Sequence, residues 1–467
     1  MPWFDETYFA SMALHFSDTG EFTAPVCPLM DYYYPQSKAY GPAYFLVLAG
    51  VIKVFGFGMF QIRLPSLLMG FAFILVAYRM LKENGSPEWL KNSFFLLLLL
   101  DPIFLQNIHS GRMDAMALFC CGLGTLFLLR AIRKPGISLY LIAGLFLGLA
   151  ILSTPRVAVN LAGAGLVAFL FFLSAPSLAS WGRLSLLALV IFALYSGWIF
   201  WGFGGYSEAW NYFFGQPKEK LYYDNLAQGY ISFKKYIPPF QVPALGLFLL
   251  LFFTWLYRRR PLPWLFWICF LNVVAFYALV RDTGIYSIFS MPWIYLLLVL
   301  LAERLLHIPA AVMWMKTALW LLVFFNAGLF GVKQLVVILS APTRNEELTF
   351  QQVSSVIPKS SKVIGDEAYY YAAIRNGCDF QYLDRGAAGF QRLKYHQEKF
   401  RFEYLIVRTP VSAPAEFNFY KEKIHLEQIA EISTPAVSPV LVRFGSLLET
   451  FGASVPAGYK GIIYKRI

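Results

Sequence analysis

The side chains that could do chemistry in this chain are ionisable groups at one set of expected helix ends. Acids there can accept protons, and guanidinium groups can bind phosphate. Ionisable groups at membrane depth are costly, so they are functional candidates by default. The set on the expected outer face comprises Asp5, Glu6, Lys38, Arg63, Asp101, Arg112, Asp114, Arg156, Arg281 and Asp282.

Asp5 and Glu6 are adjacent carboxylates in a segment that is expected to begin a short helix. Paired carboxylates can place one group as a general base while the other orients it or holds a cation. On residue type alone, a solvated acidic start to an outer loop is the simpler alternative.

The arginines also have two interpretations each. Arg63 precedes the first expected span, where it could extend to lipid head groups or clamp a phosphate bidentately. Arg112 and Asp114 lie in a tight turn between two spans, where a structural ion pair would also explain them. Asp101 lies partway along the second span, so its carboxylate should meet an arginine or line a wet cavity.

Membrane helices must position these residues. Hydrophobic residues make up 58% of the 467 residues and charged residues 14%, and the mean hydropathy is +0.55. Soluble domains carry about 25% charged residues. A span needs about 20 mostly apolar residues. Ten such runs are found, at about 64–81, 90–108, 114–130, 137–153, 157–174, 184–202, 240–257, 263–280, 286–302 and 314–336.

The basic residues of the short loops predict the orientation of the spans, because such residues concentrate on the cytoplasmic side. Every odd-numbered loop between the spans contains basic residues. They are Arg79, Lys82 and Lys91 in the first loop, Arg130, Arg133 and Lys134 in the third, Arg183 in the fifth, Arg258–Arg260 in the seventh, and Arg304 with Lys316 in the ninth. Residues 1–63 and 340–467 would then face outward, in a multi-pass protein of the inner membrane.

Three segments complete the predicted organisation. Residues 1–63 form a first outer loop, in which 42–60 are expected to lie as an interfacial helix. Residues 64–339 form the bundle of about ten spans, with a long outer loop at 203–238 of the kind that often binds substrate. Residues 340–467 form a small extracytoplasmic α/β domain. Its expected strands are Lys362–Gly365, Tyr404–Arg408, Pro439–Phe444 and Gly461–Tyr464, with a helix at Glu367–Asn376 that ends at Gly377.

The order of the motifs resembles the GT-C class of integral membrane glycosyltransferases, which use polyprenyl-phosphate sugars. The nearest branch is the bacterial one that includes protein O-mannosyltransferase-like enzymes and the aminoarabinose transferases of lipid A. The motif resemblance covers about residues 3–130, and the rest is similar in layout. The motifs are Phe4-Asp5-Glu6-Thr7-Tyr8-Phe9-Ala10, Tyr40-Gly41-Pro42-Ala43-Tyr44, Phe55-Gly56, Arg63-Leu64-Pro65-Ser66 and Arg112-x-Asp114.

The resemblance implies a polytopic helical bundle and inverting sugar transfer from a polyprenyl-phosphate donor to an acceptor hydroxyl. It implies that Asp5 is the catalytic base, with Glu6 as its partner and Asp114 facing it across the site. Arg63 would approach the donor phosphate, and Arg112, Arg281 and Lys38 are further candidates for that role. Tyr8, Tyr40, Asp101 and Tyr286 are expected to line the substrate site.

The expected partners are the lipid-linked donor, a glycan, lipid or protein acceptor, and the bilayer, but no nucleic acid. No cofactor is required by the pattern; a divalent metal ion, held by Asp5 and Asp114, stays open because relatives differ. Two rival functions also remain open, a ligase or polymerase of polyprenyl-linked glycans and a lipid or solute transporter. A transporter should show internal repeats, which the two halves do not.

The chain departs from its relatives at three places. A Glu-Lys-Pro-Pro run of many relatives is replaced by Ala39-Tyr40-Gly41-Pro42, so that Lys38 or a distant arginine would have to contact the phosphate. The position two residues after the acidic pair, which is an arginine in aminoarabinose transferases, is Tyr8 in this chain. Relatives also have a transmembrane helix ahead of the acidic loop, so the resemblance implies one further span before Asp5.

Overall fold

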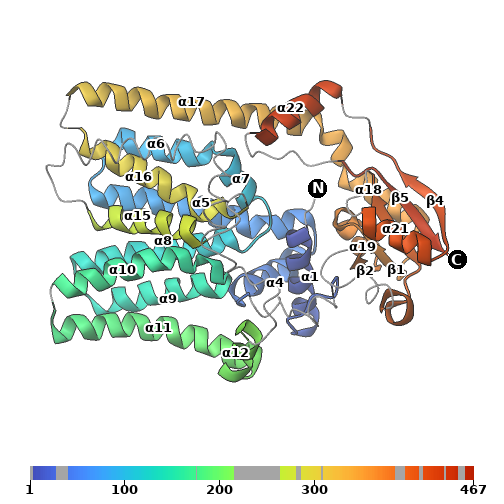
Figure 1. Ribbon diagram of the computed structural model, residues 1–467, viewed down its shortest axis with the longest axis horizontal. Coiled ribbons are helices and arrows are strands. Elements are labelled where there is room, and N and C mark those ends of the chain that lie inside the picture. Colours follow the sequence, from blue (N-terminus) through green and yellow to red (C-terminus); the bar gives the residue numbers. More distant parts are fainter. Residues whose placement is uncertain are drawn as a thin grey trace.

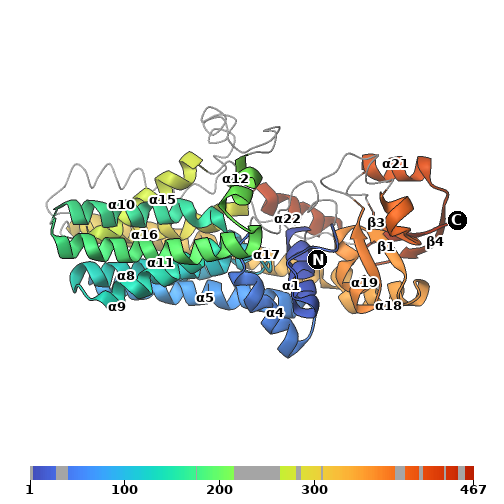
Figure 2. The same cartoon turned by 90° about the horizontal axis from the view of Figure 1, so that it is seen from below.

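The structure is a computed structural model that describes residues 4–27, 40–174, 176–214, 263–279, 285–306, 309–383, 395–409, 414–435, 438–450 and 458–467. It consists of a long helical bundle with a separate sheet-containing domain beyond one end of it, as Figures 1 and 2 show.

Nine of the ten predicted spans fall on described helices, although 90–108 is divided between two helices and 286–302 begins in a 3₁₀ turn, Ile285–Phe289, ahead of its helix. The tenth, at 240–257, lies outside the described residues. The helices are α5 (Met59–Asn84), α6 (Glu88–Leu99), α7 (Pro102–Ile108), α8 (Asp114–Arg133), α9 (Ile137–Ser153), α10 (Ala158–Ser174), α11 (Leu178–Phe203), α15 (Trp264–Leu279), α16 (Met291–Arg304) and α17 (Pro309–Leu339). Among the described residues, five helices are by themselves long and apolar enough to cross a membrane, namely α5, α8, α10 with the turn before it, α11 and α17.

The predicted span at 90–108 is divided into two helices, which is a difference from the expectation of one continuous helix. Asp101 accepts hydrogen bonds from the backbone amides of Ile103 at 2.9 Å and Phe104 at 2.6 Å. It thereby caps the N-terminus of α7, and Pro102, which has no N–H to contribute, occupies the first position of that helix. An aspartate–proline pair is a helix start signal, and it acts as one here inside an apolar run.

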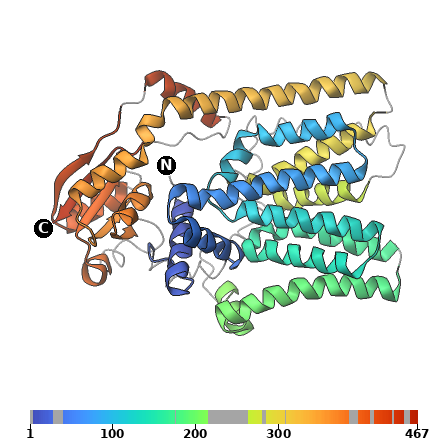
Figure 3. The same cartoon turned by 180° about the vertical axis from the view of Figure 1, so that it is seen from behind.

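Two helices occupy the end of the bundle that faces the C-terminal domain. Figures 1 and 3 both show α1 (Phe4–Thr19) and α4 (Ala43–Phe55) between the bundle and that domain. The 13 residues of α4 are too few to span a bilayer. Its Tyr44, Phe45 and Leu48 are buried, whereas Val54 and Phe55 are exposed. The interfacial position predicted for this segment stays a prediction.

The C-terminal domain contains a five-stranded sheet in the order β2-β1-β3-β5-β4, in which β1, β2 and β3 are parallel and β5 is antiparallel to both β3 and β4. The strands are β1 (Lys362–Gly365), β2 (Asp379–Tyr382), β3 (Tyr404–Arg408), β4 (Leu426–Ile432) and β5 (Gly461–Arg466). The small α/β domain predicted from the sequence is therefore confirmed.

Alternating strand residues bury both faces of this sheet. Val363 and Ile406 belong to a core that is continuous with that of the bundle, on the side of α18 (Glu346–Val356) and α19 (Tyr370–Arg375). Ile364 and Leu405 belong to a second core with residues of α21 (Pro414–Lys423). Successive side chains of a strand point to opposite faces, so each strand contributes to both cores.

One predicted strand is wrong. Pro439–Phe444 is the first part of a helix, α22 (Pro439–Thr450), and not a strand. Its Leu441 packs against Leu329, Val332 and Val336 of α17, so tertiary contact overrides the β-branched residues that suggested a strand. Two strands, β2 and β4, were not predicted. The helix predicted over Glu367–Asn376 is present as a 3₁₀ turn at Glu367–Tyr369 followed by α19, and Gly377 beyond it has φ of 77°.

Candidate active site

Helix α1 places the acidic pair so that its two carboxylates face different partners. Asp5 forms an ion pair with Arg112, whereas Glu6 is buried against Arg63. Adjacent residues of a helix point about 100° apart, which is why two neighbouring acids can serve different contacts. The side chain of Asp5 is 29% exposed and that of Glu6 only 1%. Asp5 is thus the more accessible acid of the pair.

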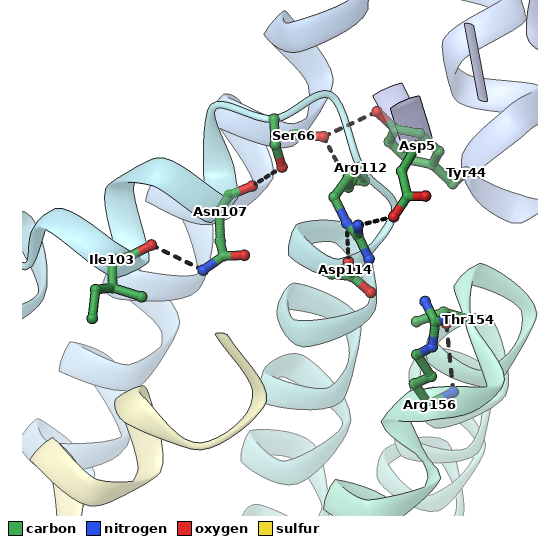
Figure 4. Close-up of polar contacts among 10 residues, drawn as sticks. Asp5, Tyr44, Ser66, Ile103, Asn107, Arg112, Asp114, Thr154 and Arg156 are labelled. Carbon is green, nitrogen blue, oxygen red and sulfur yellow. Dashed lines mark hydrogen bonds and ion pairs between the residues drawn. The ribbon is translucent and has the colours of Figure 1, made fainter. Parts of the chain in front are cut away.

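Arg112 lies between two acids from different parts of the chain. Its Nη1 donates to Asp5 of α1, and its Nε donates to Oδ2 of Asp114 at 2.6 Å (Figure 4). Burial works against the charge of Arg112, but Asp114 and Asp5 outweigh it and raise the pKa of the guanidinium. The arginine is therefore a fixed positive charge that holds two carboxylates near each other.

The turn that carries Arg112 is fixed by its backbone. Ser66 of α5 donates to the carbonyl oxygen of Arg112 at 2.6 Å, and the hydroxyl of Tyr44 lies 2.9 Å from the Ser66 hydroxyl. Gly111 has φ of 62°, and a Cβ there would come within 3.1 Å of side-chain atoms of Glu6 and Ile62. Only glycine accommodates both the positive φ and this close approach.

A second guanidinium lies across from this cluster. Arg156 begins the segment leading into α10, where the Thr154 side chain accepts a hydrogen bond from its amide (Figure 4). Its guanidinium carbon lies 4.3 Å from the ring centre of Tyr286 and 5.4 Å from that of Tyr40. Arg112 also lies 5.4 Å from the ring centre of Tyr286. The ring of Tyr286 is thus shared by two cations, at distances where cation–π attraction is favourable.

Oδ1 of Asp114 and Nη1 of Arg156 are buried and have no hydrogen bond to any described residue. Buried polar atoms are nearly always paired, so unpaired ones need an explanation, and a bound polar ligand is one. The arrangement offers an acceptor for a hydroxyl group, at Asp114, and a donor for an anion, at Arg156.

Comparison with known proteins shows what kind of scaffold carries this cluster. The model of the dolichyl-phosphate-mannose-protein mannosyltransferase family matches residues 38–201. The crystal structure of ArnT from Cupriavidus metallidurans in the apo state matches with a TM-score of 0.63 at 13% identity, covering 99% of this chain and 93% of ArnT. The same protein bound to undecaprenyl phosphate matches with a TM-score of 0.61 at 13% identity, covering 99% and 94%. No curated protein matches the sequence.

The fold of this chain is that of ArnT. The fold that the resemblance implied, a polytopic helical bundle with a C-terminal α/β domain, is confirmed, and it extends over almost the entire chain. The multi-pass membrane architecture is confirmed with it.

A divalent metal ion does not fit the acids of this site. The two carboxylates proposed to hold it, Asp5 and Asp114, both contact Arg112, which already supplies the positive charge between them. Within the described ranges, no three Asp, Glu, His or Cys residues converge in a way that could bind a metal. We therefore derive no step through a metal ion.

The structure brings together some of the residues predicted for this site and separates others. Asp5, Arg112, Asp114, Tyr40 and Tyr286 converge around the cluster described above. Asp101 lies elsewhere, with its carboxylate bonded to two amides and to Tyr295, so its predicted contact with substrate stays a prediction. Tyr8 is buried, and its substrate-lining role stays a prediction too. Lys38, Arg281 and Asp282 lie outside the described residues.

In the structure Arg63 pairs with Glu6, whereas the sequence predicted that it approaches the donor phosphate. Its Nε and Nη2 donate to the two oxygens of Glu6, each at 2.9 Å. Burial raises the pKa of Glu6, while Arg63 lowers it. Because a bidentate pair uses the fork of the guanidinium, the geometry favours Arg63 as an anchor between α5 and α1. A direct contact of Arg63 with the donor phosphate stays a prediction.

Sequence reasoning missed two contributions to this site. Arg156 was placed on the outer face but was given no role, although its position after Thr154-Pro155 marks a helix start. Tyr371 of the C-terminal domain donates to Oε1 of Glu6 at 3.3 Å across a sequence separation of 365 residues. No local pattern could have indicated that contact.

Proposed function

We propose that this chain transfers a sugar from a polyprenyl-phosphate donor to an acceptor hydroxyl on the extracytoplasmic face of the inner membrane, with inversion at the anomeric carbon. The observation that carries the proposal is an accessible carboxylate, Asp5, which pairs with Arg112, while Arg112 shares the ring of Tyr286 with a second guanidinium group, that of Arg156. ArnT, whose fold the chain shares, has been crystallised with undecaprenyl phosphate.

Asp5 is the proposed general base. Its carboxylate accepts the proton of the acceptor hydroxyl while the hydroxyl oxygen forms a bond to the anomeric carbon. The bond from that carbon to the phosphate oxygen breaks, and its electron pair leaves with the lipid phosphate. Asp114 is 2% exposed, so it is better suited to fix Arg112 than to meet an acceptor. A positioned general base typically contributes about 10²–10⁴-fold to a rate.

Arg156 is the proposed contact of the leaving phosphate. Negative charge develops on the phosphate as the glycosidic bond breaks, and a fixed cation aimed at that charge lowers the barrier. Its buried Nη1 has no hydrogen-bonding partner among the described residues and could donate to a phosphate oxygen. The unpaired Oδ1 of Asp114 could accept from a sugar hydroxyl. Lys38, Arg63 and Arg281 remain further candidates for the phosphate.

Arg156 also explains how the chain can manage without the Glu-Lys pair of many relatives. Tyr40 occupies that part of the first outer loop, and Arg156 packs over the Tyr40 ring. Gly41 lets the loop approach closely, because a Cβ there would collide with the backbone of Leu152, just before Arg156. A cation from the turn ahead of α10 would thus replace one from the loop.

The test is sugar transfer in isolated membranes. Membranes containing the chain are incubated with a set of radiolabelled polyprenyl-phosphate sugars, and the label is followed into lipid, glycan and protein fractions. The expected result is transfer by the unaltered chain and by Asp18→Asn, and none by Asp5→Asn. Asp18 is an exposed acid at the other end of the same helix, so it controls for the loss of a carboxylate. Transfer by Asp5→Asn at the normal rate would refute the base assignment.

A further inference from the structure

Helix α1 has two faces with different contacts. Asp5 and Phe9 share one face, where Asp5 pairs with Arg112 and the Phe9 ring packs against Tyr40 and against Phe45 of α4. Residues three and four apart lie on the same side of a helix, which places Asp5 and Phe9 together. Glu6 and Thr7 contact tyrosines of the C-terminal domain, as described below. The helix that carries the proposed base is therefore held between the bundle and the C-terminal domain (Figures 1 and 3).

Tyrosine hydroxyls of the C-terminal domain make the contacts on the second face. The hydroxyl of Tyr382, in β2, lies 2.5 Å from Oγ1 of Thr7, and that of Tyr371, in α19, donates to Glu6 at 3.3 Å. The backbone amide of Tyr382 also donates to the carbonyl of Val26, in the segment after α1, at 2.9 Å.

These hydroxyls lie in a dry environment. Tyr371, Tyr382, Glu6 and Thr7 are all nearly or fully buried. The ring of Tyr371 stacks on Phe57, with 5.5 Å between ring centres, so it cannot easily turn away from Glu6. Burial, together with the charge of Glu6, raises the pKa of Tyr371 well above its usual value, and burial does the same for Tyr382. Both hydroxyls therefore keep their protons.

We propose that the C-terminal domain is a positioning element of the reaction, because the hydroxyls of Tyr371 and Tyr382 hold α1 where Asp5 meets Arg112 and the substrate. This proposal rests on the proposed function of Asp5. Neither tyrosine is a catalytic residue, since each acts through α1. A displacement of about 1 Å in a reacting group can reduce a rate by about 10²-fold, so a small loosening of α1 would be visible in turnover.

The test compares three tyrosine-to-phenylalanine variants of the full-length chain. Tyr371→Phe and Tyr382→Phe each remove one hydroxyl that contacts α1 and keep the ring. Tyr369→Phe is the matched control, because the Tyr369 hydroxyl is buried too but donates to the carbonyl of Tyr459 at 2.9 Å, within the C-terminal domain. Turnover number and donor KM are measured per folded enzyme, and hydrogen exchange is measured at the amides of α1.

The expected result is a loss of turnover of about tenfold in each of the two variants and up to about 100-fold in the double variant, with donor KM changed less than about threefold. Exchange in α1 should rise, and Tyr369→Phe should show neither effect. Thr7→Val removes the Tyr382 contact from the other side. It should reproduce Tyr382→Phe, and combining the two changes should add little.

The proposal is overturned if Tyr371→Phe and Tyr382→Phe leave turnover and α1 exchange as they are, or if Tyr369→Phe has the same effects. A failure of the proposed function looks different. In that case the unaltered chain moves no sugar from any lipid-linked donor, while α1 exchange still responds to the two variants and not to the control.

Discussion

The cluster of Asp5, Arg112, Asp114 and Arg156 and the network around Asp101 both bury charge in a membrane protein, but they satisfy it differently. We refer to the first as the outer cluster, because it contains a partly exposed acid, and to the second as the inner network, because its groups bond to one another inside the protein. The outer cluster is built from ion pairs and contains a partly exposed acid together with unpaired buried atoms. In the inner network, the Asp101 carboxylate is bonded on both oxygens by groups of the protein.

The inner network joins α7, α16 and α17. Tyr295 donates to Oδ2 of Asp101 at 2.7 Å and accepts from Asn326 at 3.1 Å. Lys333 donates to the carbonyl of Pro102 at 3.2 Å and to Oε1 of Gln106 at 2.9 Å. Every one of these groups is used to attach one helix to another.

The difference indicates how to separate function from structure among costly buried charges. A network whose polar atoms are satisfied internally stabilises the fold and has little left for a ligand. A cluster that leaves donors and acceptors unpaired next to an accessible acid has spare capacity for a substrate. Changes in the outer cluster should therefore affect activity, and changes in the inner network should affect stability.

The largest effect is expected for Arg112→Lys. Lysine keeps the charge but loses the planar fork that contacts Asp5 and Asp114 together, so the base is no longer fixed. Initial rates of sugar transfer should fall about 10²–10³-fold. Arg130→Lys is the matched control at the other end of α8, where Arg130 pairs with Glu83, and it should retain normal rates. Equal losses in both variants would show that the rate of sugar transfer does not depend on the outer cluster in particular.

Arg156→Gln should give the next largest effect, on the donor. Losing a charged hydrogen bond to phosphate costs about 1.5–3 kcal/mol, which corresponds to about 10- to 100-fold. The apparent affinity for a polyprenyl-phosphate sugar should weaken by that factor, measured as donor KM and by equilibrium binding of polyprenyl phosphate. Arg156→Lys should recover part of it. Unchanged donor binding would show that Arg156 serves only the packing of Tyr40 and Tyr286.

Tyr295→Phe should affect stability and hardly affect activity. The substitution removes the hydrogen bond to one oxygen of Asp101 and the hydrogen bond from the side-chain amide of Asn326. The free energy of unfolding should fall by about 1–3 kcal/mol. The thermal unfolding midpoint in detergent should fall, while the rate per folded enzyme stays within about twofold. Tyr140→Phe removes a single hydrogen bond to the carbonyl of Ala131 and should cost less. A loss of rate without a loss of stability would give the inner network a catalytic role.

Much of the bundle and part of the site could be predicted from the sequence. Spans are recognisable because about 20 apolar residues in a row carry their own signal. The acids and arginines at one set of span ends stood out because ionisable groups are expensive there. The break at Asp101-Pro102 was also signalled, by a capping residue followed by proline, but the apolar run around it concealed it.

The remaining features depend on contacts between distant parts of the chain. The bonds from Tyr371 to Glu6 and from Tyr382 to Thr7 join residues 365 and 375 positions apart, and no local pattern encodes them. Pro439–Phe444 became helical because it packs on α17, which its own residues could not reveal. The bidentate pair of Arg63 with Glu6 was hidden because an arginine can equally bind phosphate.

The most direct test of the account is one paired measurement on two identical substitutions, Asp5→Asn and Asp101→Asn. For each variant, the single-turnover rate of sugar transfer per folded enzyme and the thermal midpoint are determined in the same preparation. The account predicts that Asp5→Asn loses at least about 10²-fold in rate with a nearly unchanged midpoint. It predicts that Asp101→Asn keeps its rate and loses several degrees of midpoint. Matching profiles in the two variants, or a normal rate in Asp5→Asn, would contradict it.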